Sequence, residues 1–214
     1  MTKTVSGKAS QPPFSPGEST QLQPRPAWLS APGGQGQHPQ LSASALSPVR
    51  GRVAVFIDGL SLFLSAKQLG IEIDYQQLLR YLSRRGQLLH AFFYAGIDQE
   101  LDSSRQQGFL TWMRHHGYRV VTKTVQHFPD GNRKLDIDVE IAVDMMKLAP
   151  SCDTMVLVSG NDTLTYAVRR VGERGVRVEL LALNGFTGPA LLNWVDDYTD
   201  LTSIQAEISL GHRG

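Results

Sequence analysis

The chain has 214 residues, 41% of them apolar, and a formal net charge of +1. This composition is ordinary for one globular domain, and the sequence has no apolar run of about 18 residues that would predict a membrane-spanning helix. The single cysteine, Cys152, excludes an intramolecular disulfide and a cysteine-based zinc site. Together with the lack of a secretory signal pattern, it predicts a cytoplasmic protein that does not associate with membranes.

Residues 1–50 are rich in Ser, Pro, Gln and Gly and have little apolar periodicity. Such a segment cannot bury enough surface to offset its conformational entropy, so we expect it to be disordered. Residues 1–52 contain five Lys and Arg side chains against one acid, Glu18, which leaves the rest of the chain mildly acidic. Trp28 and Leu29 are its only sizeable apolar pair, either a docking motif for a protein partner or a simple exposed pair.

A strand–helix alternation begins at residue 53, where Val-Ala-Val-Phe-Ile forms a continuous apolar run typical of a buried parallel strand. Further strands are expected at 88–95, 118–125, 154–158 and 176–183. Helices are expected at 60–68, 74–84, 99–116, 136–149 and 162–173, with a loop at 128–132 and a last helix or turn from residue 190. The alternation predicts an α/β fold, a three-layer α/β/α sandwich around a mainly parallel five-stranded sheet. We assign residues 51–205 to this domain and 206–214 to a tail.

Function in such sheets gathers at the carboxyl ends of the strands, so residues that follow strands are the candidates. Asp58 stands directly after the first strand and before Gly59. A carboxylate at this position could meet a ligand at the sheet edge. It could equally cap the following helix, because Asp accepts hydrogen bonds from the first free N–H groups.

A second candidate group lies at the start of the helix expected at 136–149. Its four acids are Asp136, Asp138, Glu140 and Asp144. Helical spacing puts Asp138 on the apolar side of that helix, where an unpaired charge is expensive. Asp138 therefore needs a partner, and a metal ion or Lys134 would supply one. Stabilisation of the helix dipole by first-turn acids explains Asp136 but not Asp144.

The third group follows the strand at 154–158 and includes Ser159, Asn161 and Asp162. Small residues and oxygen donors between a strand and a helix are typical of anion or metal sites. Ordinary helix capping by Asp162 or Thr163 explains the pattern equally well. No P-loop, no Gly-x-Ser-x-Gly elbow and no His-Glu-x-x-His motif is present in the sequence.

Four segments, in this order, carry a known pattern. Residues 55–59 read Val-Phe-Ile-Asp-Gly, and residues 134–146 contain Lys-Leu-Asp-Ile-Asp-Val-Glu followed by Asp-Met-Met. Residues 157–162 read Leu-Val-Ser-Gly-Asn-Asp, and residues 195–198 read Val-Asp-Asp-Tyr. Together they resemble the NYN family, the LabA-like branch of the PIN-like nucleases, over about residues 53–201.

The resemblance implies a sheet edge whose acids bind Mg²⁺ or Mn²⁺ and cut RNA. The residues that it implies for catalysis are Asp58, Asp138, Asp144 and Asp162, with Asp58, Asp138 and Asp162 as the metal ligands. The residues that we expect to contact RNA are Ser61, Ser159, Asn161, Lys123, Arg133 and Lys134, with Arg169 and Arg170 as further phosphate contacts.

Three positions depart from the family pattern. Ser61 replaces an Asn, and Asn161 and Thr163 stand where the family has two Asp residues, with Asp162 between them. Three alternatives follow: Asp162 takes over the role, the site binds metal weakly, or catalysis has been lost. We therefore expect a metal-dependent ribonuclease, with a non-catalytic regulator that binds RNA or a protein as the alternative. A homo-oligomer is compatible with either reading.

Overall fold

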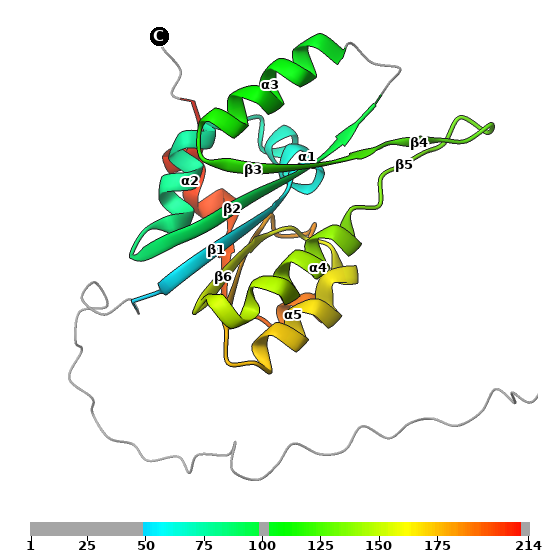
Figure 1. Cartoon of the computed structure of the whole chain (residues 1–214). Helices are drawn as coiled ribbons and strands as arrows, with labels where there is room; N and C mark the ends of the chain where they lie inside the picture. Colours follow the sequence, from blue (N-terminus) through cyan, green and yellow to red (C-terminus); the bar gives the residue numbers. More distant parts are fainter. Residues whose placement is uncertain (1–48, 99–102, 211–214) are drawn as a thin grey trace, which may run out of the picture. The chain divides into compact units, whose positions relative to one another are not determined.

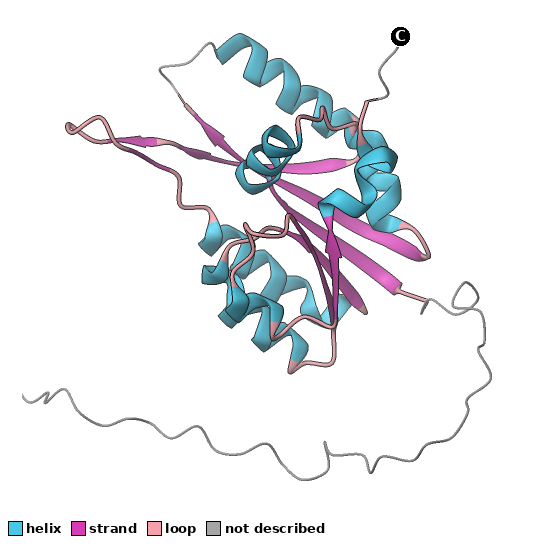
Figure 2. Cartoon of the chain, turned by 180° about the vertical axis from the view of Figure 1, so that it is seen from behind, coloured by secondary structure: helices cyan, strands magenta, loops and turns pink. Residues whose placement is uncertain are grey.

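A computed structural model of the protein describes residues 49–98 and 103–210. The expected α/β class is confirmed, because helices cover both faces of a central parallel sheet (Figures 1 and 2). Residues 1–48, for which we expected disorder, lie outside the described residues. So do residues 99–102, the expected start of one helix. Within the two described ranges, no helix is long and apolar enough to cross a membrane.

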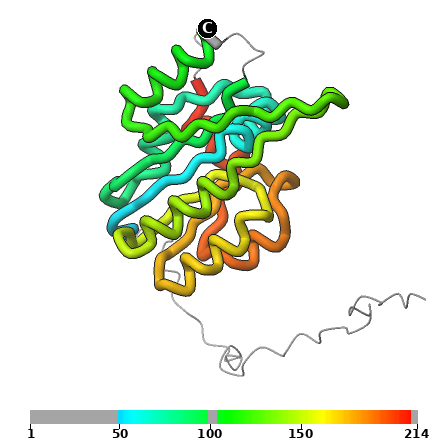
Figure 3. The backbone as a smooth tube through the Cα atoms, turned by 45° about the vertical axis from the view of Figure 1, so that its right-hand side comes forward, coloured from blue at the N-terminus to red at the C-terminus, as the bar shows by residue number. Residues whose placement is uncertain are grey.

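The central sheet contains six strands in the order β3-β2-β1-β6-β7-β8. They are β1 (Gly51–Asp58), β2 (Gly86–Ile97), β3 (Tyr118–Thr124), β6 (Thr154–Val158), β7 (Arg177–Ala182) and β8 (Asp197–Asp200). Every neighbouring pair is parallel. A separate antiparallel hairpin, β4 (Gln126–His127) and β5 (Arg133–Lys134), extends away from the sheet (Figure 3).

The helices are α1 (Gly59–Leu69), α2 (Tyr75–Ser83), α3 (Ser103–His115), α4 (Asp138–Leu148), α5 (Thr165–Gly172), α6 (Pro189–Leu192) and α7 (Leu201–Ile208). Two 3₁₀ turns, η2 (Ala149–Ser151) and η3 (Asp162–Leu164), complete the described elements. Helices α1, α2, α3 and α7 pack on one face of the sheet, and α4, α5 and α6 pack on the other.

The central strand explains why two cores form. Val53, Ala54, Val55, Phe56 and Ile57 are all fully buried, as expected for a parallel strand covered on both faces. Because side chains alternate along a strand, the odd-numbered residues join the core under α1, α2, α3 and α7, and the even-numbered ones join the core under α4 and α5. The next residue with the even-numbered orientation is Asp58.

The sheet has one strand more than the sequence predicted. Strand β8 pairs with β7 at the sheet edge and reads Asp-Tyr-Thr-Asp, without an apolar run. An edge strand has a neighbour on one side only, so it needs less apolar surface than a central strand does. The short strands β4 and β5 were also not expected. They flank the loop that the sequence predicted at 128–132.

The helix ends follow the sequence in most places. Asp74 caps α2 as predicted, because its carboxylate accepts hydrogen bonds from the N–H groups of Gln76 and Gln77. Helix α4 begins at Asp138 and not at Asp136 as we expected. Ile137 is only 4% exposed and packs in the core under α4, so the chain first crosses the sheet edge in a non-helical conformation and only then turns into the helix.

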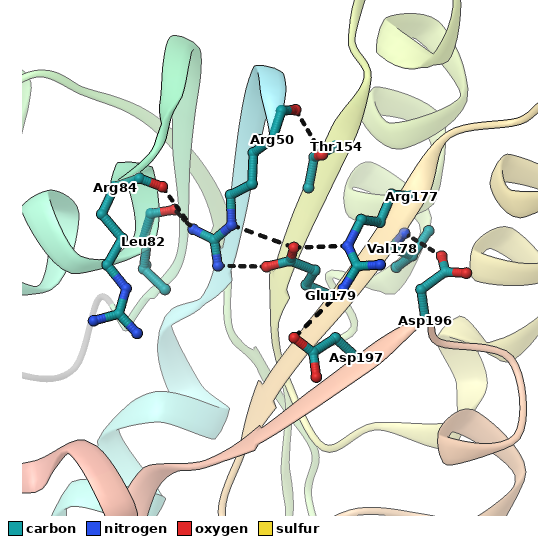
Figure 4. Close-up of polar contacts among 9 residues, drawn as sticks. All are labelled: Arg50, Leu82, Arg84, Thr154, Arg177, Val178, Glu179, Asp196 and Asp197. Carbon is teal, nitrogen blue, oxygen red and sulfur yellow. Dashed lines mark hydrogen bonds and ion pairs between the residues drawn. The ribbon is translucent and has the colours of Figure 1, made fainter. Parts of the chain in front are cut away.

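An ionic network closes the amino edge of the sheet (Figure 4). Glu179 of β7, with an 8% exposed side chain, accepts hydrogen bonds from Arg50 and from Arg177 Nε, the latter at 2.9 Å. Arg50 also donates to the Leu82 carbonyl at 2.8 Å, and Arg177 pairs with Asp197 of β8 at 3.5 Å. The network joins the residue before β1 to the last two strands of the sheet.

Candidate functional site

Strand order puts one crevice at the carboxyl edge of the sheet. From β1 the chain proceeds outward to β2 and β3, whereas β6, the other neighbour of β1, leads outward to β7 and β8. The connections therefore leave β1 and β6 in opposite directions, which opens a crevice between their carboxyl ends. Asp58 ends β1 and Ser159 follows β6, so both residues lie at this point.

Asp58 is a buried acid, only 6% exposed. One carboxylate oxygen accepts hydrogen bonds from the N–H groups of Leu60 and Ser61, both at 3.1 Å, and so caps α1. The other oxygen accepts from Ser159 Oγ at 3.1 Å. Burial raises the pKa of Asp58, and the charge of Asp138 raises it further, although the hydrogen bonds act in the opposite direction. The capping interpretation is confirmed, and the carboxylate also lies within electrostatic range of a second acid.

That second acid is Asp138, the first residue of α4. Its carboxylate accepts two hydrogen bonds from the Asn161 amide, at 3.0 and 2.9 Å, and one from the hydroxyl of Thr163. The expectation that Lys134 would supply the partner is wrong, because Lys134 pairs with Asp136 at 3.6 Å. The two residues that replace the family's acids thus donate hydrogen bonds to an acid, which ionised Asp side chains at these positions could not do.

Asp162 lies beside this pair but is held by another element. Its carboxylate accepts a hydrogen bond from the Leu191 N–H at 2.9 Å, in the first turn of the short helix α6. A Cβ built on Gly188 would lie only 1.8 Å from its carboxyl carbon, so this glycine is required for the close approach. The expectation that Asp162 or Thr163 caps the helix after β6 is wrong, because Asn161 is the cap: its Oδ1 accepts a hydrogen bond from the Thr163 N–H at 3.1 Å, and Asp162 bonds α6 instead. Nothing local to residue 162 reveals this contact.

The loops after β6 and β7 also touch directly. Gly160 accepts a hydrogen bond from the Gly188 N–H at 3.2 Å, and its own N–H donates to Ser61 Oγ at 3.1 Å. A Cβ on Gly160 would lie 2.1 Å from the Phe186 carbonyl oxygen. The sequence analysis missed Gly160 and Gly188, which hold these loops together, because their partners are far along the chain.

Asp144 lies two turns further along α4 and accepts a hydrogen bond from the Tyr94 hydroxyl at 3.0 Å. Burial raises the pKa of Tyr94 well above its ordinary value, and Asp144 raises it further. The phenol therefore stays protonated and keeps donating. The contact ties α4 to β2 on the face of the sheet where Asp138 also lies.

The basic residues expected to contact RNA each pair with an acid. Lys123 pairs with Glu140 at 2.9 Å and Arg133 with Asp98 at 3.0 Å. Arg169 and Arg170 both pair with Glu173, at 2.9 and 2.6 Å. Lys123, Arg133 and Lys134 belong to the segment that leads into and out of the hairpin, on the carboxyl side of β3. They therefore lie towards the carboxyl edge of the sheet, the edge at which Asp58 ends β1.

A hollow of about 410 Å³ opens over the crevice, and we call it the acid hollow. It is lined by Asp58, Leu60, Ser61, Leu64, Gly160, Asn161, Asp162, Phe186 and Gly188. Within residues 49–98 and 103–210, no three His, Cys, Asp or Glu side chains gather as a metal-binding group. Mg²⁺ commonly needs only one or two carboxylates, with water and phosphate oxygens completing its coordination. Asp58 lines the hollow directly, and Asp138 is hydrogen-bonded to Asn161, which also lines it.

Comparison with known proteins agrees with this geometry. A model of the NYN domain matches residues 52–202, which include both carboxyl-edge acids and, apart from the first residue of β1, all six strands of the sheet. The chain belongs to the NYN family.

The NYN domain resembles two further proteins. The chain is 30% identical to the low amplitude and bright protein LabA of Synechococcus elongatus over 170 residues. This alignment covers 76% of this chain and 90% of that protein. A crystal structure of a protein of unknown function from Vibrio parahaemolyticus shares the fold, with a TM-score of 0.65 and 23% identity. That match covers 77% of this chain and 99% of the other. The resemblance stated from the sequence motifs is confirmed, and with it membership of a family of PIN-like nucleases.

Proposed function

We propose that this NYN domain is a metal-dependent ribonuclease and that its site is the crevice between β1 and β6. The observation that supports this most strongly is the pair Asp58 and Asp138, two acids from distant parts of the chain that lie close enough for the charge of Asp138 to raise the pKa of Asp58. Two carboxylates in such proximity repel, and the raised pKa of the buried Asp58 reflects both burial and that repulsion. A cation relieves both effects.

In this proposal Asp58 and Asp138 hold Mg²⁺ or Mn²⁺. The ion would supply an activated water and would neutralise charge on the phosphodiester. Ser159 donates to Asp58 and keeps that carboxylate oriented, and the N–H groups of α1 fix its other oxygen. Asn161 holds Asp138 from the opposite side of the crevice. Asp144 and Asp162, bonded to Tyr94 and α6, support these elements and complete the acidic surroundings.

The Lys123, Arg133 and Lys134 side chains supply positive charge beside the crevice. Lys123 and Lys134 are partly or well exposed, as are their acidic partners, so these two ion pairs are worth little and can be exchanged for a phosphate. Arg133 is half exposed and keeps its pair with the buried Asp98, so it adds charge without leaving that acid. RNA is the proposed substrate, since its backbone places a phosphate at every nucleotide and such contacts provide most of the sequence-independent affinity.

A non-catalytic regulator is the second candidate, and one observation favours it. Asn161 and Thr163 occupy both oxygens of Asp138 with hydrogen bonds, whereas a third acid at either position would add charge for a cation. Such a domain would bind RNA, or a protein partner, without cutting.

Cleavage assays separate the two candidates. Labelled single-stranded and structured RNAs are incubated with the protein in Mg²⁺, Mn²⁺ or EDTA, beside the double variant Asp58→Asn/Asp138→Asn. Glu207→Gln is the matched control, because it makes the same change at an exposed acid on α7 that pairs with Arg84. A ribonuclease cuts in Mg²⁺ or Mn²⁺ only, loses cutting in the double variant and keeps it in the control. Binding of RNA by folded wild-type protein with no cutting in any metal would instead establish the regulator.

A further inference from the structure

A second hollow of about 530 Å³ lies at the same sheet edge, on the face that α1, α2 and α3 cover, and we call it the aromatic pocket. Its lining comes from α1, α2, α3, the end of β2 and the base of the hairpin. Four aromatic side chains contribute to it: Phe63, Tyr75, Phe93 and Phe109. The volume is in the range of pockets that hold small organic ligands or one unit of a larger one, about 300–1,000 Å³.

Three of the four rings form a fixed cluster. Tyr75 and Phe93 meet edge to face with centroids 5.7 Å apart, and Phe109 lies 5.2 Å from Tyr75 and 5.8 Å from Phe93. Phe63 of α1 is different, since 60% of its surface is exposed. An exposed aromatic ring beside an aromatic floor is available to stack on a flat ligand.

The two hollows are adjacent. Leu60 lines both of them, and Gly59, which lines the aromatic pocket, is the residue after Asp58. A ligand group at Asp58 is therefore separated from the aromatic pocket by the first turn of α1. A polymer with a charged backbone and flat side groups could occupy both at once, with its phosphate in the acid hollow and its neighbouring group between the rings.

One wall of the aromatic pocket is polar. Asp98, only 5% exposed, accepts hydrogen bonds from Arg133 and His127, and the Gln106 amide donates to the Gly96 carbonyl at 2.7 Å. These contacts fix polar groups beside an apolar floor. A nucleobase has that same division, because its faces are apolar and its edge carries donors and acceptors.

We propose that the aromatic pocket binds a nucleobase of single-stranded RNA, that of a nucleotide next to the phosphate held at Asp58 and Asp138. This inference rests on the proposed function, because it takes RNA as the substrate. The pocket selects an unpaired base, since a base stacked in a duplex cannot enter it. The domain thereby prefers single-stranded RNA and fixes which phosphate reaches the acids.

The test uses a fluorescently labelled single-stranded RNA and a set of the same RNA in which one base at a time is missing. Binding is measured on ice in Mg²⁺, because the proposed phosphate contact at Asp58 and Asp138 needs the cation, and each sample is run on a gel to check that its RNA is uncut. We expect wild-type protein to bind about tenfold more weakly when one particular base is missing, in the range measured for base–aromatic stacking. Phe63→Ala should weaken binding of the intact RNA about as much and should no longer respond to that missing base.

Tyr166→Ala is the matched control. Tyr166 on α5 is 71% exposed and lies outside both hollows, so this variant should bind every RNA as the wild type does. Because Phe63 is largely exposed, its replacement should leave the thermal unfolding temperature unchanged, and that measurement accompanies the binding data.

The outcomes distinguish the two proposals. If wild-type protein binds and cuts the intact RNA but no missing base matters, or if Phe63→Ala retains the wild-type response, the aromatic pocket does not hold a base and the proposed function stands. A pocket that instead receives a protein side chain would give that result. If wild-type protein neither binds nor cuts RNA, the proposed function fails and the base-binding proposal fails with it.

Discussion

Replacing Asn161 with Asp tests the contact that closes the acid pair. The Asn161 amide donates to both oxygens of Asp138, at 3.0 and 2.9 Å. In Asn161→Asp a second carboxylate would occupy that position. Two unit charges about 3 Å apart repel by about 5 kcal/mol at an effective dielectric constant of about 20. The substitution therefore turns an attractive contact into a strongly repulsive one.

The destabilisation has an upper limit, because one carboxyl group of the pair can take up a proton and restore the hydrogen bond. For a carboxyl group with an ordinary pKa near 4, that uptake costs about 4 kcal/mol at pH 7 and about 1.5 kcal/mol at pH 5. The folded variant then binds a proton that the unfolded chain does not bind. Its stability, relative to wild type, must fall as pH rises between 5 and 7.

Urea unfolding of Asn161→Asp, Asn161→Ala and wild type at both pH values in EDTA measures this. The alanine variant loses the hydrogen bond without adding charge, so its stability difference from wild type should be the same at pH 5 and pH 7. Mg²⁺ should recover most of the loss in Asn161→Asp, since binding to the folded state alone stabilises it. Equal stability of Asn161→Asp and wild type at pH 7 in EDTA would mean that the amide does not contact Asp138. A loss that Mg²⁺ leaves unchanged would refute the cation site.

Three further predictions concern stability and reactivity. Burial raises the pKa of Asp58, so the wild-type protein loses folding stability as pH rises through that pKa. In urea unfolding, Asp58→Asn should therefore match or exceed the stability of wild type at pH 7, and its advantage should be smaller near pH 4. Gly188→Ala should lower the free energy of unfolding by about 1–3 kcal/mol, because the added Cβ meets the Asp162 carboxylate. Gly172→Ala adds its Cβ in open space and should show no measurable loss of stability when both variants are compared by thermal unfolding. Burial raises the pKa of the Cys152 thiol to about 11, so a thiol reagent at pH 8 should label unfolded protein far faster than folded protein.

Local patterns predicted the elements that local physics determines. The run at 53–57 predicted a strand buried on both faces, and Asp74 predicted a helix start, because each signal depends on the residue's own neighbours. Strand β8 was missed because an edge position lets a polar segment pair without an apolar pattern. The start of α4 was misplaced because the core position of Ile137 overrides the preference of Asp136 for a helix N-terminus.

The site was predictable in its members but not in its contacts. Asp58 follows a strand in the sequence itself, whereas its proximity to Asp138 depends on β6 lying next to β1, which no local pattern encodes. The same holds for the contact of Asn161 with Asp138, 23 residues apart, and of Asp162 with the turn at Gly188. Contacts between residues far apart in the sequence depend on the order of the strands in the sheet, and the order of the motifs along the chain does not predict them.

The ionic network at the amino edge bears on where this chain can be shortened. The region that matches the NYN model begins at residue 52, two positions beyond Arg50, whose guanidinium bonds both Glu179 and the Leu82 carbonyl (Figure 4). A fragment trimmed to that homology boundary would leave the buried Glu179 with Arg177 as its remaining arginine partner in the network. The shortest fragment for expression that keeps this ionic network therefore starts at or before Arg50. The region matched by sequence similarity starts two residues later and leaves that arginine out.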